Sequence, residues 1–109
     1  MNKERSTQVR GFVVEDNIYV LWIDLSNDST YVVDENDKIL LEFNSSCYAF
    51  QSNGYQLGKI FGVPENGLTF KFSNVAHGNE ITYPPTKAVE AYLDFEVVIA
   101  KELITNKVI

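Results

Sequence analysis

Runs of β-branched and aromatic residues, separated by short polar turns, occupy much of the first half of the chain, which is a pattern typical of β-strands. Residues 8–15 and 18–25 are both rich in β-branched and aromatic side chains, and the pair Asp16-Asn17 lies between them. An Asp-Asn pair between two such runs favours a tight turn. We therefore predict a β-hairpin over residues 8–25.

The two faces of the run 18–25 differ in polarity. One face is uniformly apolar, and we predict that it belongs to the core. Its residues are Tyr19, Leu21, Ile23 and Leu25. The opposite face carries Trp22 beside Asp24 and is expected to be partly open. Trp22 is either an exposed anchor for a partner or a core residue beneath a helix, and the sequence leaves both interpretations open.

A second hairpin is predicted directly after the first. A polar turn at residues 26–29 precedes the strand-like runs 30–34 and 38–43, and these two runs flank Glu35-Asn36-Asp37. Four consecutive strands joined by short polar turns favour an antiparallel meander.

The spacing of apolar and small residues becomes helical after Ser45. Such residues recur at intervals of three and four, at Cys47, Phe50, Gly54, Leu57 and Phe61. This stripe predicts a helix that Ser45 or Ser46 caps and Gly62 ends. The pair at 53–54 weakens the prediction, because a glycine inside a helix costs about 1 kcal/mol relative to alanine. Whether residues 54–58 are helical, kinked or broken therefore stays open.

The last third of the chain predicts one more strand and a closing helix. Residues 68–72 alternate in polarity as a strand does, and residues 74–86 are loop-like. Residues 89–93 fit either a short strand or the first turn of a helix. Asp94 is a candidate cap for a terminal helix, although the region after it also fits a strand, because Val97, Val98 and Ile99 favour strands. The predicted inner side of that helix consists of Phe95, Val98, Ile99, Glu102 and Leu103.

Together these patterns predict an α+β fold. We expect a mainly antiparallel sheet, beginning with the N-terminal meander, and one or two helices packed on one face. A chain of 109 residues with 45% hydrophobic and 13% aromatic residues fits one domain, spanning residues 1–109, with its own core.

Cysteine use and hydropathy indicate the compartment. The single cysteine, Cys47, cannot form an internal disulfide, which fits a reducing environment. The N-terminus is polar and is not followed by the apolar region of a signal peptide. The longest uninterrupted apolar stretch, Ile18–Ile23, is far shorter than the roughly 20 residues of a membrane helix. We expect a cytoplasmic protein with no membrane partner.

Negative charge is concentrated in residues 15–44. This window holds eight acidic residues and one basic residue, a net charge of −7, while the whole chain has a net charge of −6. Such a field attracts a basic partner and repels phosphate backbones and anionic lipid. Nucleic acid is therefore excluded as the expected partner.

Residues that could support catalysis or metal binding are sparse. His77 is the only histidine, and a zinc site needs several ligands at defined spacing. Cys47 lies on the apolar stripe, which favours a buried structural thiol over a nucleophile. Residues 34–37 carry four oxygen side chains but lack the spacing of a calcium loop. We predict no catalytic residue, no metal, no cofactor and no enzymatic activity.

Protein binding is the remaining function class. Tryptophan is enriched at interface hot spots, and acidic side chains steer basic partners. The alternative for the acidic residues is a solubilising surface without a partner. The candidate binding residues are Trp22, Asp24, Asp28, Asp34, Glu35 and Asp37.

Part of the chain resembles small bacterial immunity proteins, especially those paired with contact-dependent growth inhibition toxins. The run Tyr31–Asp34, a polar turn and the run Lys38–Ser45 resemble their strand–turn–strand that leads into a serine-capped helix. Gly62-Val63 matches the end of that helix, and Tyr92–Phe95 resembles the step into their closing helix. The chain departs from the pattern at Gln51–Gly54, where those proteins have continuous helix. The resemblance covers about half the chain.

The resemblance implies a partner and a role. It implies that the protein binds one cognate toxin domain, commonly a basic nuclease, and neutralises it inside the cell that makes it. No contact residue is carried over, because such proteins differ in the surface they use. The alternative is a small structural or regulatory module that self-associates through a sheet edge. The sequence leaves open the oligomeric state and the identity of the toxin.

Overall fold

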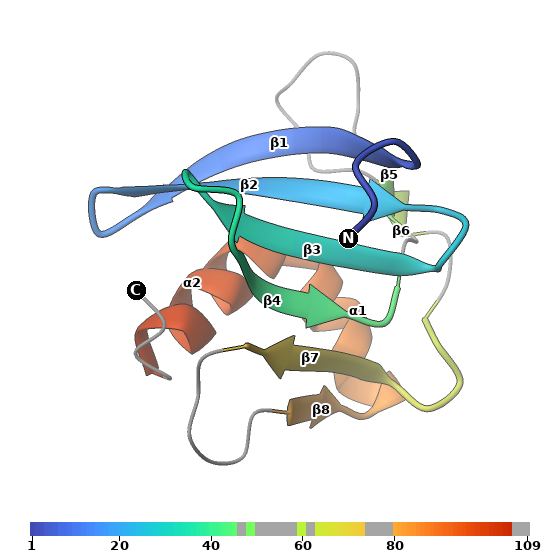
Figure 1. The fold of residues 1–109 in the computed structure, drawn as a ribbon. Coiled ribbons are helices and arrows are strands. Elements are labelled where there is room, and N and C mark those ends of the chain that lie inside the picture. The colour runs from blue at the N-terminus through green and yellow to red at the C-terminus, as the bar shows by residue number, and fades with distance from the viewer. Residues whose placement is uncertain (46–47, 50–58, 61–62, 74–79, 106–109) are drawn as a thin grey trace.

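The structure, a computed structural model, describes residues 1–45, 48–49, 59–60, 63–73 and 80–105 of the chain. These residues form a six-stranded antiparallel sheet with two helices packed against one face, together with a separate two-stranded pair (Figure 1). The predicted α+β class is therefore confirmed.

The elements have the following bounds. The strands of the large sheet are β1 (Ser6–Val14), β2 (Asn17–Asp24), β3 (Ser29–Asp34), β4 (Ile39–Phe43), β7 (Leu68–Phe72) and β8 (Glu80–Tyr83). The separate pair consists of β5 (Tyr48–Ala49) and β6 (Lys59–Ile60). The helices are α1 (Pro85–Leu93) and α2 (Phe95–Thr105).

The first four strands form the predicted meander. The order in the sheet is β1-β2-β3-β4-β7-β8, and every neighbouring pair is antiparallel. The turn between β1 and β2 consists of Glu15 and Asp16, one residue earlier than predicted. Both residues have positive φ, 48° and 67°, as in the two-residue turns that match the twist of a hairpin.

The apolar face of β2 faces the helices, as predicted for Tyr19, Leu21 and Ile23, which are all buried. The prediction for Leu25 is wrong, because its side chain is 75% exposed. The strand ends at Asp24, so Leu25 lies in the following turn and leaves the period-two pattern.

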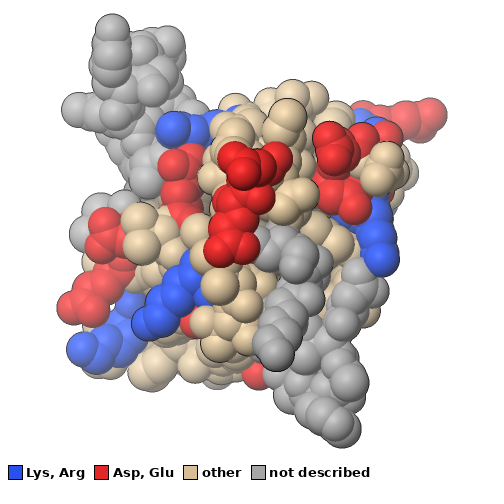
Figure 2. All heavy atoms as spheres, turned by 90° about the vertical axis from the view of Figure 1, so that its left-hand side faces the viewer, with Lys and Arg blue, Asp and Glu red and all other residues tan. Residues whose placement is uncertain are grey.

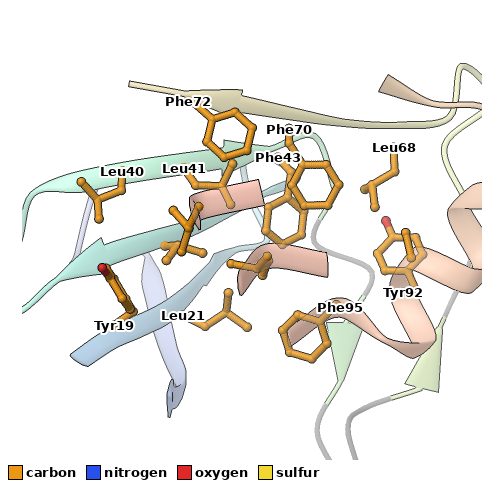
Figure 3. Close-up of a cluster of buried hydrophobic side chains, with 14 of the residues drawn as sticks. Tyr19, Leu21, Leu40, Leu41, Phe43, Leu68, Phe70, Phe72, Tyr92 and Phe95 are labelled. Carbon is orange, nitrogen blue, oxygen red and sulfur yellow. The ribbon is translucent and has the colours of Figure 1, made fainter. Parts of the chain in front are cut away.

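The core lies between the sheet and the two helices. Figure 3 shows Phe43 and Phe70 side by side, with a ring-centroid distance of 5.0 Å, and Tyr92 and Phe95 entering from the helices. The edge of the Tyr83 ring packs against Phe70 at 5.6 Å, in the T-shaped geometry that aromatic quadrupoles favour. Because these aromatic side chains come from distant parts of the chain, they hold the two layers together.

The closing helix begins after Asp94, as predicted. The Asp94 amide donates to the Glu90 carbonyl at 3.1 Å, and the Asp94 carbonyl accepts from the Val98 amide at 2.9 Å. The same residue therefore ends α1 and starts α2. Residues 89–93, which fitted either a strand or a helix, are helical. The prediction of a loop over residues 74–86 is wrong at Glu80–Tyr83, which form strand β8.

The helix predicted after Ser45 is wrong at the positions that the structure describes. Tyr48 pairs with Ile60 and Ala49 with Lys59 as antiparallel strands, and a helix brings no such distant residues together. Tyrosine and isoleucine favour strands, which explains why the three- and four-residue spacing misled. The predicted helical residues at 46–47, 50–58 and 61–62 lie outside the described part of the chain.

Candidate protein-binding surface

The turns of the meander divide its acidic residues between the two ends of the sheet. Since consecutive strands are antiparallel, the β1–β2 and β3–β4 turns lie at one end and the β2–β3 turn at the other (Figure 1). The first end holds Glu15, Asp16, Asp34, Glu35 and Asp37. We call these five residues the acidic end.

The β3–β4 turn is held in place by its own aspartate. Asp34 Oδ1 accepts hydrogen bonds from the Asn36 amide at 2.8 Å and the Lys38 amide at 2.9 Å. The Asp34 amide donates to the Lys38 carbonyl at 2.9 Å. The Asp34 carboxylate is therefore half-buried in the turn, whereas Glu35 and Asp37 are exposed. These bonds fix the loop that presents the two exposed carboxylates.

Tyr19 shows that the two turns lie close together. It pairs with Asp34 across β2 and β3, three residues beyond the end of the first turn. Burial raises the pKa of Tyr19, and the carboxylates of Asp34, Glu15 and Glu35 raise it further. Because carboxylates from both turns act on one phenol, the acidic end is a single region of negative potential.

Figure 2 looks onto this end of the molecule and shows Asp and Glu side chains over its centre and to one side, with Lys and Arg mostly toward the margins. Among the acidic-end residues, Glu15, Asp16, Glu35 and Asp37 are exposed. Aspartate tolerates the positive φ of 67° at Asp16 and 64° at Asp37, so both turns can carry a carboxylate where most residues would be strained.

The opposite end of the sheet holds two of the predicted binding residues, Asp24 and Asp28. The prediction that Asp24 belongs to a binding surface is wrong. Its side chain is only 1% exposed, so it cannot belong to a binding surface. Asp24 Oδ1 accepts from the Ser26 hydroxyl at 2.6 Å, the Ser26 amide at 3.0 Å and the Asn27 amide at 3.2 Å. The carboxylate therefore organises the β2–β3 turn.

The electrostatic setting of Asp24 agrees with that role. The hydrogen bond from the Ser26 hydroxyl lowers the pKa of Asp24, and burial acts in the opposite direction. The amides of Asn27 and Ser26 and the charge of Arg5 lower the pKa further. Asp28 lies in the same turn and is exposed, with φ 48°. The six residues of β3 separate it from the acidic end, which is about 20 Å for an extended strand.

Trp22 lies on the outer face of the sheet, opposite the helices, between Gln8 of β1 and Tyr31 of β3. It is partly buried, and its indole N–H has no acceptor among the residues that the structure describes. The interpretation of Trp22 as a residue beneath a helix is therefore wrong.

Lys3 connects Trp22 with the acidic end. The Lys3 Nζ lies 5.5 Å from the centroid of the Trp22 ring and 2.7 Å from Asp37 Oδ2. A cation over an aromatic face and beside a carboxylate is held by two separate electrostatic contacts.

Sequence reasoning grouped Asp34, Glu35 and Asp37 correctly but missed three residues. Glu15 and Asp16 join the acidic end because the first and third turns of a meander lie on the same side, a rule that could have identified them. Lys3 had no comparable signal, because its contacts depend on how the N-terminal residues fold back over the sheet.

Alternative chemistry has little support in the described part of the chain. Among the described residues, no three carboxylate side chains form a group that could hold a metal ion. Cys47 and His77, the two residues considered for nucleophilic chemistry, lie outside the described ranges. None of the helices formed by described residues is long and apolar enough to cross a membrane.

An open groove of about 490 Å³ runs along the two helices. Val97 and Val98 line it, and its rim carries both lysines and carboxylates. Because the charges are mixed, the groove shows no preference for a basic or an acidic partner.

Comparison with known proteins assigns no family. No protein-family model matches the chain, and no curated protein and no solved structure matches it. Support for a function therefore comes from the surface itself.

Proposed function

We propose that this protein is a non-enzymatic binding domain that receives a basic protein partner at its acidic end. In keeping with the resemblance to immunity proteins, we propose that the partner is a toxin domain, which the protein neutralises inside the cell that makes it. The observation that carries the proposal is the convergence of four exposed carboxylates, those of Glu15, Asp16, Glu35 and Asp37, from two separate turns.

The clustering of these carboxylates affects how fast a cationic partner encounters the protein. Carboxylates that share one end of the domain produce a field that raises the encounter rate with a cationic protein. The hydrogen bonds of Asp34 hold the β3–β4 turn before a partner arrives. Less conformational entropy is lost on binding when a contact loop is already ordered.

The described residues contain two of the features on which the resemblance rests, and they depart from a third. The hairpin of β3 and β4 corresponds to the strand–turn–strand, and Asp94 stands at the step into α2. The serine-capped helix has no counterpart at Tyr48–Ala49 or Lys59–Ile60. The identity of the partner as a toxin therefore depends on the first two features and on charge.

The test neutralises the acidic end without changing the fold. The variant combines Glu15→Gln, Asp16→Asn, Glu35→Gln and Asp37→Asn, and it keeps Asp34 because that carboxylate holds the turn. The binding partner is the candidate toxin domain, a basic protein to be sought in the neighbouring gene. We expect association to slow by about tenfold or more at low ionic strength, with a weaker dependence on salt.

A matched control neutralises four exposed acidic residues elsewhere. It combines Asp28→Asn, Glu65→Gln, Glu80→Gln and Glu90→Gln, and so has the same net charge as the first variant. We expect its association rate to stay within about twofold of wild type, because local potential rather than net charge steers the encounter. Equal slowing of both variants would contradict the placement of the partner at the acidic end.

Self-association is the second candidate function, and one observation favours it. Strand β1 is an edge of the sheet, and beside that edge Val13 is 66% and Ile18 51% exposed as a cross-strand pair. Exposed apolar residues on an edge strand favour pairing with a second copy. Light scattering over a range of concentrations tests this: dimers that Val13→Lys disrupts would support it, and a monomer at every concentration would eliminate it.

A further inference from the structure

The N-terminal residues make a contact with the sheet that resembles the binding of a ligand. Lys3 Nζ lies 2.7 Å from Asp37 Oδ2 and 5.5 Å from the centroid of the Trp22 ring. An aromatic face and a carboxylate on either side of an ammonium group are the two parts of a receptor for a lysine or arginine side chain. Here the chain supplies its own cation.

Other hydrogen bonds in this segment are local. Residues 1–5, which we call the N-terminal arm, precede β1. The Arg5 amide donates to the Asn2 carbonyl at 3.1 Å, and the hydroxyl of Ser6, the first residue of β1, donates to the same carbonyl at 2.7 Å. The Glu4 amide donates to Asn2 Oδ1 at 2.9 Å. These bonds shape the arm but do not attach it to β2 or to the β3–β4 turn.

The contact of Lys3 is also open to solvent. The side chain of Lys3 is 48% exposed and that of Asp37 is 63% exposed. Ion pairs and cation–π contacts at exposed sites are weak, because water screens the charges and holding a long side chain loses entropy. A cation that gains further contacts at the acidic end can therefore displace Lys3.

We propose that Trp22 and Asp37 form a binding site for a lysine or arginine side chain of the partner, which Lys3 occupies in the free protein and leaves on binding. The inference rests on the proposed function, since it takes the partner to be basic. Asp37 belongs both to this site and to the acidic end, so one partner can contact both. The site adds an aromatic anchor to an otherwise purely electrostatic surface.

Trp22 makes the site directly observable, because it is the only tryptophan of the chain. The probe is a short oligolysine peptide, and the measurement is its dissociation constant from Trp22 fluorescence. The variant Lys3→Gln removes the internal cation and keeps a side chain of similar length. We expect it to bind the peptide about threefold to tenfold more tightly than wild type, because the peptide no longer competes with Lys3.

The matched control is Lys87→Gln, since Lys87 lies on α1 and its side chain is 64% exposed. This control gives the protein the same net charge as Lys3→Gln without opening the site. We expect it to leave the affinity close to that of wild type. In the double variant Lys3→Gln/Asp37→Asn, we expect the gain in peptide affinity to disappear. We expect the same in Lys3→Gln/Trp22→Leu, whose peptide affinity is measured by calorimetry.

Two results would overturn the inference. One is equal affinity of Lys3→Gln and Lys87→Gln for the peptide, and the other is the absence of peptide binding by every variant. The proposed function fails differently: toxin association would be insensitive to neutralisation of Glu15, Asp16 and Glu35. A protein that loses toxin association on that neutralisation, but shows no effect of Lys3→Gln, would keep the function and lose this site.

Discussion

Aspartate has two roles in this protein, and the surroundings of each carboxylate decide between them. Asp24 and Asp34 accept backbone hydrogen bonds and shape turns, whereas Asp37 is exposed and forms an ion pair with Lys3 at 2.7 Å. Both roles appear in the sequence as an acidic residue in a polar stretch. Sequence reasoning therefore identified the acidic segment but could not separate carboxylates that build turns from those that are free to contact a partner.

The turn-building role of Asp24 predicts a pH dependence of stability. Its pKa is lowered in the folded protein, so the stability it contributes is present above the unfolded value, near 3.8, and is lost as the pH falls through the folded value. Asp24→Asn is expected to flatten the dependence of the unfolding free energy on pH below about 4. Urea unfolding at a series of acidic pH values measures it.

Asp28→Asn is the control for this prediction, because Asp28 is an exposed residue of the same turn. We expect it to change the acidic limb less than Asp24→Asn does. An acidic limb that Asp24→Asn leaves unaltered would show that the hydrogen bonds to Asp24 do not stabilise the folded state.

A second pH dependence comes from the buried contact between the sheet and α2. The Tyr83 hydroxyl donates to Glu102 Oε1 at 2.8 Å. Burial, together with this bond and the charge of Glu102, raises the pKa of Tyr83 from 10.0 to about 12. The folded state therefore holds this proton more tightly than the unfolded state. Stability from Tyr83 is complete below about pH 10 and is lost as the pH rises toward 12.

Tyr83→Phe is expected to reduce the loss of stability between about pH 10 and 12. It does not abolish the loss, because the pKa of Tyr19 is also raised. Guanidinium unfolding across this range gives the measurement. If wild type and Tyr83→Phe lost stability in parallel, the Tyr83 proton would not be linked to folding.

At the scale of elements, strand-like patterns predicted the meander and β7 well. The three- and four-residue spacing after Ser45 predicted a helix where the described residues form strands. Strands β2 and β7 show alternating burial, because one face of each is covered and the other is more open, whereas β3 is buried on both faces and was predicted from its strand-like run between polar turns. The stretch after Ser45 failed because short apolar runs fit both a strand and a helix. Strand β8 was missed because four residues inside a loop-like stretch give too little periodicity.

One glycine shows how tightly neighbouring elements meet. Gly67 has φ 86°, and a Cβ at this position would collide with the backbone carbonyl of Tyr83. Gly67→Ala is expected to lower the unfolding free energy by about 2 kcal/mol or more, because both the left-handed backbone and the contact with β8 disfavour a side chain. Urea unfolding at neutral pH gives the value.

Gly11 provides the matched control. A Cβ added there meets only the Tyr19 carbonyl oxygen, at 3.7 Å, which is an ordinary contact. Gly11→Ala is expected to change stability by less than about 1 kcal/mol, with stabilisation favoured because alanine restricts the unfolded chain. Equal destabilisation by both substitutions would mean that the approach of residue 67 to β8 is not the cause.

At the scale of the whole molecule, topology turns a charged segment into a directional field. The sequence predicted an acidic surface from residues 15–44 but did not show that antiparallel strands sort their turns between two ends. As a result, Glu15 and Asp16 lie at the same end of the sheet as the predicted Asp34, Glu35 and Asp37. Asp28 lies at the other end. Sequence reasoning left Trp22 open between an interface anchor and a core residue, and its contact with Lys3 depends on tertiary structure and had no sequence signal.

The most direct measurement of the central claim is a hydrogen–deuterium exchange footprint of the protein with and without the proposed toxin partner. Placement of the partner at the acidic end predicts slower exchange at residues 14–17 and 34–38 in the complex, and unchanged exchange in the turn at 25–28. Slower exchange at 25–28, with residues 14–17 and 34–38 unchanged, would contradict it.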